Sequence, residues 1–314
     1  MKEASIGVRQ QPVVGRRARR RGAWMEPVIG YLLSLPAIVY ILILVGYPFF
    51  LSLYFSVNYL AIGGEYRGFA GLNNFTSLLD NPVFRRAFLN TLGFTFFSEI
   101  AKAALGIGLA FLLLQPLLGK KIVRAFLMLP FTLPFALSLL GWQWMYDPTF
   151  SVINYLFGHD LHLFHKPYPD WLGSPFWSWW AILIVNIWRG FPFAGVIILA
   201  GLTSIPGDLL DAAKVDGGGF FRTWHYVITP IIAPILFIGL VYDVTFTIGD
   251  LTAVYRLTQG GPGFSTETLP MEAWQVGIVG GNLGSGAAIT LFLFPFLVAG
   301  VIVVLRMLYR REAL

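Results

Sequence analysis

Two runs of polar and aromatic residues lie inside otherwise apolar segments. They are Asn186, Arg189, Gly190 and Phe193, and then Asp243, Phe246, Thr247 and Asp250. Positions i, i+3, i+4 and i+7 share one face of an α-helix, so each run is expected to form a stripe. Carboxylates, amides and a guanidinium hydrogen-bond to hydroxyl groups, and an aromatic ring stacks on the C–H face of a sugar. The stripes therefore favour a neutral polyhydroxylated solute; the structural alternative is that Arg189 only neutralises Asp243.

A further pair of charges lies in another apolar run. Glu99 and Lys102 stand three residues apart, so they can pair on one helix face. Charged groups within a bilayer are costly unless they are paired or hydrated, which leaves both a structural and a functional interpretation of this pair open.

The two stripes together contain two acidic residues and one arginine. This balance disfavours a phosphorylated solute, because phosphate prefers a net positive pocket.

No catalytic or metal-binding residue is expected. The chain has no cysteine, which removes thiolate ligands, cysteine nucleophiles and disulfides. The segment 159–165 has three histidines at intervals of three beside Asp160, but Pro167 and Pro169 follow and the histidines do not share one helical face. We therefore interpret it as a hydrated loop and not as a zinc site. The glycine-rich stretch 277–286 lacks the Lys-Ser/Thr of a phosphate-binding loop, so no ATP site is expected on this chain.

The elements that position these residues are membrane-spanning helices. Hydrophobic residues make up 56% of the 314 residues and charged residues only 12%, whereas an ordinary soluble domain carries about 25% charge. A bilayer is spanned by about 20 apolar residues in a helix. We predict an all-α integral membrane protein in contact with lipid, with six transmembrane helices, at about 28–57, 87–117, 122–146, 176–203, 228–250 and 284–308.

The distribution of basic residues predicts the orientation. With the N-terminus inside, 15 of the 22 Lys and Arg residues fall in inner segments and 5 in outer loops. The positive-inside rule then places both termini in the cytoplasm. We divide the chain into a basic N-terminal tail (1–27), a transmembrane domain (28–308) and a C-terminal tail (309–314). Because the basic cluster directly precedes the first span, a nucleic-acid partner is not supported.

The cytoplasmic gap at 204–227 has the pattern of a structured projection. Ser204 is expected to cap a helix with Pro206 in its first turn, and acidic residues favour its positive end. Three glycines, 217–219, are expected to stop that helix before a second short one begins. A helix–glycine–helix segment of this kind predicts a docking projection. The alternative, an amphipathic helix in the lipid interface, usually has a Lys/Arg-rich polar face, which is missing here.

This segment resembles the coupling-loop motif of ABC importer permeases. The motif is an acidic residue, two alanines, three residues, a glycine, nine residues and Ile-x-Leu-Pro. Asp211 stands where the motif has Glu, and Ala212, Ala213 and Gly217 follow at the same spacing. At the far end, the run 227–230 is Val-Ile-Thr-Pro, so Val replaces Ile and Thr replaces Leu.

Other stretches narrow the resemblance to carbohydrate importers of the maltose and glycerol-phosphate type, and to the first permease of the pair. These stretches are 69–75, 90–91, 124–130, 200–206 and 257–262, the last followed by Thr266 and Thr268. The resemblance covers roughly residues 30–308.

The resemblance implies the type I ABC importer permease fold in the cell (plasma or inner) membrane. It implies four kinds of partner: a second homologous permease, two ABC ATPase subunits, an extracytoplasmic solute-binding protein and a sugar-like solute. ATP and Mg would be bound by the ATPase, with no cofactor on this chain. The residues of the coupling loop that would contact the ATPase are Asp211, Ala212, Ala213, Asp216, Gly217 and Pro230. The helices that carry the two stripes would line the sugar pocket.

Two other classes of function are alternatives to an importer subunit. A stand-alone secondary carrier or a membrane-embedded enzyme would need no cytoplasmic coupling loop. The sequence does not identify the solute, although the resemblance favours a disaccharide-like sugar.

Overall fold

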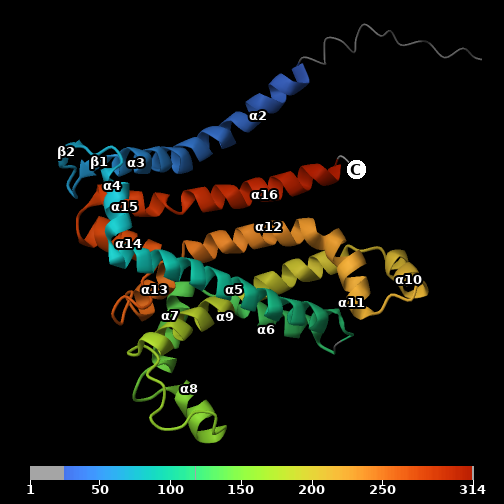
Figure 1. Ribbon diagram of the computed structural model, residues 1–314. Helices are drawn as coiled ribbons and strands as arrows, with labels where there is room; N and C mark the ends of the chain where they lie inside the picture. The colour runs from blue at the N-terminus through green and yellow to red at the C-terminus, as the bar shows by residue number, and fades with distance from the viewer. Residues whose placement is uncertain (1–24, 117, 313–314) are drawn as a thin grey trace, which may run out of the picture. The chain divides into compact units, whose positions relative to one another are not determined.

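The computed structural model describes residues 25–116 and 118–312, which are mostly helical (Figure 1). The predicted tails lie outside these residues, except for 25–27 and 309–312. The chain forms two compact units that meet between Ser52 and Leu53. The first unit contains α2 (Met25–Ile41), a π-helical turn η1 (Leu42–Gly46) and the start of α3 (Tyr47–Ser56).

In the second unit, three short elements precede the long helices. Strands β1 (Asn58–Leu60) and β2 (Tyr66–Phe69) pair antiparallel, with Asn58 opposite Phe69 and Leu60 opposite Tyr66. Helix α4 (Asn73–Asp80) follows. The remaining elements, in order, are α5 (Pro82–Leu114), α6 (Lys120–Thr132), α7 (Phe135–Met145), α8 (Val152–Asn154), η2 (Tyr155–Asp160), α9 (Pro175–Thr203), α10 (Gly207–Val215), α11 (Phe220–Thr223), η3 (Trp224–Ile228), α12 (Thr229–Ile248), α13 (Thr252–Leu257), α14 (Leu269–Trp274), η4 (Gln275–Val279), α15 (Leu283–Leu291) and α16 (Phe294–Glu312).

The predicted all-α membrane architecture is confirmed. Within the described residues, five helical stretches are long and apolar enough to cross a membrane: Gly30–Ser56, Pro82–Leu114, Pro175–Thr203, Phe220–Leu257 and Leu283–Val303. They correspond to five of the six predicted spans, with boundaries that differ by several residues.

The third predicted span, 122–146, is not one straight helix. It is formed by α6 and α7, which meet at an angle of 92°. Leu133 is extended, with φ −68° and ψ 144°, because the ring of Pro134 disfavours the helical conformation of the residue before it. Pro134 then occupies the N-cap position of α7. The count of six spans therefore holds only if this bent pair is counted as one span.

Helices α5, α9 and α12 pack along one another, and small residues permit the close approach. A Cβ on Gly106 of α5 would lie 2.9 Å from the backbone nitrogen of Gly195 on α9, and a Cβ on Gly239 of α12 would lie 2.8 Å from Ile197. Close backbone contact at small residues is a common basis of helix association in membranes. The three helices thereby bring side chains from distant parts of the sequence face to face.

The predicted helix–glycine–helix projection is present. Helices α10 and α11 lie beyond the ends of α9 and α12, away from α13 and α14 (Figure 1). Gly217, after α10, has φ +73°, a conformation that glycine adopts easily. The predicted capping role of Ser204 is wrong. Its Oγ donates to the carbonyl oxygen of Gly201 at the end of α9 (2.7 Å), and the N-cap position of α10 is Pro206.

The loop between α13 and α14 contains a fully buried acid. Glu267 is completely shielded from solvent, and neither of its carboxylate oxygens has a hydrogen-bond partner among the described residues. The loop is held by α5, where Arg86 donates to the carbonyl of Gly263 (2.8 Å) and Asn90 donates to that of Glu267 (2.9 Å). Burial, and secondarily the nearby Glu272, raises the pKa of Glu267 to about 8. The acid is therefore neutral in the folded loop at neutral pH.

A pH-dependent stability follows from this burial. Above pH 4.5 the unfolded state loses the Glu267 proton, while the folded state keeps it up to about pH 8. The free energy of unfolding should thus fall as the pH rises through this window. Glu267→Gln should make the unfolding midpoint, measured by thermal unfolding between about pH 5 and 8, less dependent on pH. The exposed Glu65, paired with Arg67, provides the control Glu65→Gln, and an equal effect of both variants would contradict this interpretation.

Candidate functional site

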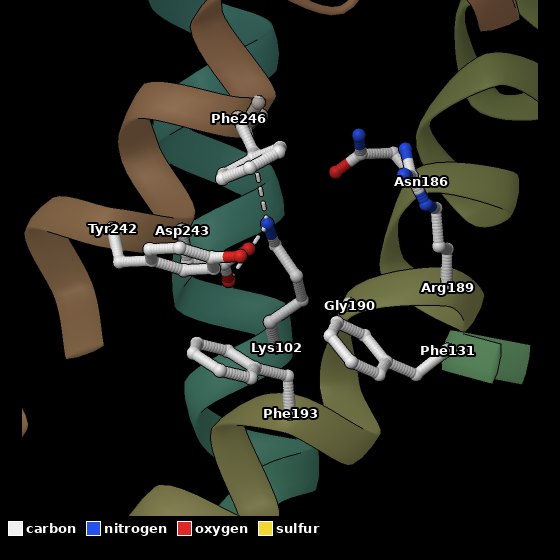
Figure 2. Close-up of a pocket in the computed structure, with 10 residues that line it drawn as sticks. Lys102, Phe131, Asn186, Arg189, Gly190, Phe193, Tyr242, Asp243 and Phe246 are labelled. Atoms are coloured by element: carbon white, nitrogen blue, oxygen red, sulfur yellow. Dashed lines mark hydrogen bonds and ion pairs between the residues drawn. The ribbon is translucent and has the colours of Figure 1, made fainter. Parts of the chain in front are cut away.

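Lys102 of α5 lies at the centre of a buried polar network. Its Nζ lies 2.6 Å from Glu99 Oε1 and 2.7 Å from Thr247 Oγ1. It also lies 3.0 Å from Asp243 Oδ2 (Figure 2). Thr247 also donates to Glu99 (2.9 Å). The Lys102 side chain is 2% exposed, so its charge depends on these partners for neutralisation. The predicted pairing of Glu99 with Lys102 is confirmed, and the carboxylate of Asp243 is paired with Lys102 and not with Arg189.

A cavity of about 130 Å³ borders this network. It brings together all four residues of the first predicted stripe and three of the second. Its lining consists of Lys102, Phe131, Asn186, Arg189, Gly190, Phe193, Tyr242, Asp243, Phe246 and Thr247. The two stripes therefore face one another across one hollow between α9 and α12 (Figure 2).

Asp250 is not part of this lining. Its Oδ1 accepts hydrogen bonds from the backbone N–H groups of Thr252 (3.0 Å) and Ala253 (3.2 Å), at the start of α13. Its Oδ2 accepts from Nδ2 of Asn186 (3.2 Å). Asp250 thus fixes the orientation of the Asn186 amide.

Asn186 and Arg189 bring polar groups to the wall of the cavity. Oδ1 of Asn186 is buried, has no hydrogen-bond partner among the described residues and points into the cavity (Figure 2). The guanidinium of Arg189 lies 4.0 Å from the ring centre of Phe135, a cation–π contact. No carboxylate in the described part of the chain forms an ion pair with Arg189. The site therefore offers a hydrogen-bond acceptor beside a cation.

Sequence reasoning missed two aromatic residues of the lining. Phe131 reaches the cavity from α6 and stacks on Phe193 with a centroid distance of 5.5 Å. Tyr242 packs on Phe193 (4.9 Å) and on Phe246 (4.6 Å). Tyr242 directly precedes Asp243, which is a local signal for it. The position of Phe131 depends on how the bent α6–α7 segment packs against α9, for which the sequence has no local signal.

The predicted coupling residues lie on the α10–α11 projection and at the start of α12. Asp211 pairs with Lys214 at 2.8 Å, and both side chains are 73% exposed. No residue of α10 is buried, so Ala212 and its neighbours are open to a partner surface. Pro230 lies in the first turn of α12, as predicted.

The histidine-containing loop shows local contacts. Nδ1 of His159 lies 2.9 Å from Asp160, and Nδ1 of His162 lies 3.2 Å from the backbone oxygen of Asp160. Within residues 25–116 and 118–312, no group of three or more His, Cys, Asp or Glu side chains is arranged so that it could hold a metal ion.

The chain matches the model of a known family. Residues 102–311, about two thirds of the chain, match the family described as binding-protein-dependent transport system inner membrane component. This range includes Lys102, both stripes and the whole α10–α11 projection.

Known proteins resemble the chain over most of its length. The trehalose/maltose transport system permease MalF of Thermococcus litoralis is 29% identical and is aligned over 92% of this chain and 97% of its own. A probable ABC transporter permease, y4oQ, of Sinorhizobium fredii is 30% identical over 90% of this chain and 89% of its own. Among solved structures, a chain of a bacterial ABC transporter that imports the acidic polysaccharide alginate matches with a TM-score of 0.75 and 20% identity, over 93% of this chain and 99% of that chain. The two chains share a fold.

Gly190 provides a test of the packing around Lys102. A Cβ at this position would collide with Cδ of Lys102 and lie 3.3 Å from its Nζ, while the ammonium group is held by its partners. Gly190→Ala should therefore lower the free energy of unfolding by about 1–3 kcal/mol, the usual cost of overpacking. Thermal unfolding of the full chain in detergent would measure this change.

Gly108→Ala is the matched control. Gly108 also lies inside a helix, and a Cβ there would meet nothing within 4 Å. Because alanine favours a helix more than glycine does, stability should be unchanged or higher. An equal loss of stability in both variants would show that the Gly190 effect does not come from Lys102.

Proposed function

The chain belongs to the family of binding-protein-dependent transport system inner membrane components, and we propose that it forms, with a second homologous permease, the pore through which an ABC importer brings a sugar-like solute into the cell. It is a multi-pass membrane permease. ATP is hydrolysed by separate ATPase subunits, which would also bind the Mg. The observation that carries the proposal is the pair of polar stripes facing one hollow, on helices that lead to an exposed projection.

The chemistry of the hollow supports a polyhydroxylated solute. The free Oδ1 of Asn186 accepts a hydrogen bond and Arg189 donates several. The rings of Phe193, Tyr242 and Phe246 supply flat apolar surfaces beside them. The names of several relatives fit this chemistry: trehalose/maltose, sulfoquinovosyl glycerol, diacetylchitobiose and sn-glycerol-3-phosphate systems.

The α10–α11 projection would dock on an ATPase subunit through Asp211, Ala212, Ala213, Asp216 and Gly217. In the proposed orientation both termini and this projection are cytoplasmic, as the distribution of basic residues predicts. An extracytoplasmic binding protein would then deliver the solute at the opposite side. One solved alginate transporter of the same fold is in complex with a periplasmic protein that holds an alginate pentasaccharide.

Replacing Asn186 tests the solute site. Asn186→Leu keeps the size of the side chain and removes the free acceptor, so the KM for uptake should rise roughly tenfold, the effect of losing a buried hydrogen bond to a ligand. Uptake of labelled sugars into membrane vesicles containing the complete transporter would measure it. Thr245→Val is the control, because Thr245 Oγ1 bonds to the backbone of its own helix at Val241. An unchanged KM for Asn186→Leu would remove Asn186 from the site.

Replacing Gly217 tests the docking role. A valine at φ +73° is strained, so Gly217→Val should distort the turn after α10 and abolish uptake while the protein is still inserted in the membrane. Gly219, two residues later, has φ −70° and space around it. Gly219→Ala should therefore preserve uptake. Co-purification with the ATPase should fail in the first variant alone; normal uptake by Gly217→Val would contradict docking through this turn.

A further inference from the structure

A second cavity lies beside the polar one, toward the α10–α11 projection. It measures about 190 Å³, and most of its wall is apolar. It is lined by Glu99, Lys102, Ala103, Ile107, Phe193, Ala194, Ile197, Ile198, Trp224, Leu236, Gly239, Leu240 and Asp243. Trp224 belongs to η3, the turn that joins the projection to α12.

Three residues are common to the two linings: Lys102, Phe193 and Asp243. Along α12 the polar cavity is lined at Phe246 and Thr247 and the apolar one at Leu240 and Leu236, with Asp243 between them. On α9, the residues that line the polar cavity precede Phe193, and those that line the apolar cavity follow it. The shared residues therefore form a partition between two cavities that follow one another along the helix axes.

The partition is held by charge and by ring packing. The Lys102–Asp243 ion pair joins α5 to α12 at 3.0 Å. The ring of Phe193 is held between Phe131 and Tyr242. These contacts connect α9 to the two neighbouring helices at the level of the ion pair.

Glu99 allows Lys102 to separate from Asp243 and still keep a carboxylate partner. It lies one helical turn from Lys102 on α5 and is 2.6 Å from its Nζ. If α12 moves away from α5, Lys102 keeps a carboxylate partner on its own helix, and only Asp243 loses its partner. Asp243 would then face the polar cavity, where water or solute hydroxyl groups can donate to it. Opening therefore does not leave Lys102 unpaired in the membrane, where an unpaired charge is costly.

We propose that the Lys102–Asp243 ion pair, together with Phe193, closes the path between the two cavities and opens to let the solute pass, with Glu99 retaining Lys102 in the open state. The proposal rests on the proposed importer function and assigns positioning roles to Lys102 and Glu99. Because Trp224 lines the apolar cavity, movement of the α10–α11 projection would directly displace part of the wall of that cavity.

The absence of cysteine from the sequence makes an accessibility experiment direct. Leu240→Cys reports on the apolar cavity and Phe246→Cys on the polar one, on the same helix. A membrane-impermeant thiol reagent is added to the extracytoplasmic side of right-side-out vesicles that contain the complete transporter without ATP. In the Asp243→Asn background, labelling at Leu240→Cys should accelerate roughly tenfold, because the ion pair is lost. Labelling at Phe246→Cys should stay the same.

Three further variants, each combined with Leu240→Cys, test whether the ion pair and the ring close the path. Glu99→Gln leaves the Lys102–Asp243 pair in place and should leave the labelling of Leu240→Cys slow. Asp243→Glu keeps the charge and should do the same. Phe193→Ala removes the ring while Lys102 keeps its pairs with Glu99 and Asp243, so it should accelerate labelling even if Asp243→Asn inserts poorly.

The closure is overturned if Leu240→Cys is labelled at the unmodified rate in both the Asp243→Asn and Phe193→Ala backgrounds. It is also overturned if labelling at Phe246→Cys rises equally, because the helix would then be loosened as a whole. Solute uptake by vesicles that contain the complete transporter without these substitutions separates the two proposals. Normal uptake with unaltered labelling contradicts the closure alone, whereas a complete transporter that takes up no sugar contradicts the importer function.

Discussion

The ammonium group of Lys102 has to be neutralised inside a membrane-spanning bundle, and the arrangement of three helices depends on this requirement. Glu99 on the same helix and Asp243 on α12 supply the countercharges, and Thr247 adds a hydrogen bond. The aliphatic part of the Lys102 side chain fits against α9 only because Gly190 has no side chain. Around this buried charge, α5, α9 and α12 thus present residues that fit it to one another.

The same network determines which groups remain open to a solute. Because Lys102 engages both Glu99 and Asp243, the carboxylates of the site are occupied in this state, and Asp250 is engaged at the start of α13. The Asn186 oxygen has no hydrogen-bond partner among the described residues, and the Arg189 guanidinium contacts the ring of Phe135. The balance of two acids against one arginine, counted from the stripes alone, therefore does not describe the charge that the cavity presents.

The length of the apolar runs predicted the spans, and helical periodicity predicted the two stripes, since both are local patterns. Seven of the eight stripe residues line one cavity. The glycines after α10 likewise predicted where that helix ends. Contacts between distant segments had no such signal: the pairing of Asp243 with Lys102, the arrival of Phe131 from α6, and the burial of Glu267. Pro134 was a visible local signal for the break in the third span, but apolar composition alone suggested one continuous helix.

The 92° break between α6 and α7 bears on how the chain is made. With 13 and 11 residues, neither helix reaches across a hydrocarbon layer of about 30 Å at 1.5 Å per residue. The backbone groups at the break also cannot face lipid without partners. Because α6 packs against α9, the bent segment can reach its final packing only after α9, which lies later in the chain, has been synthesised.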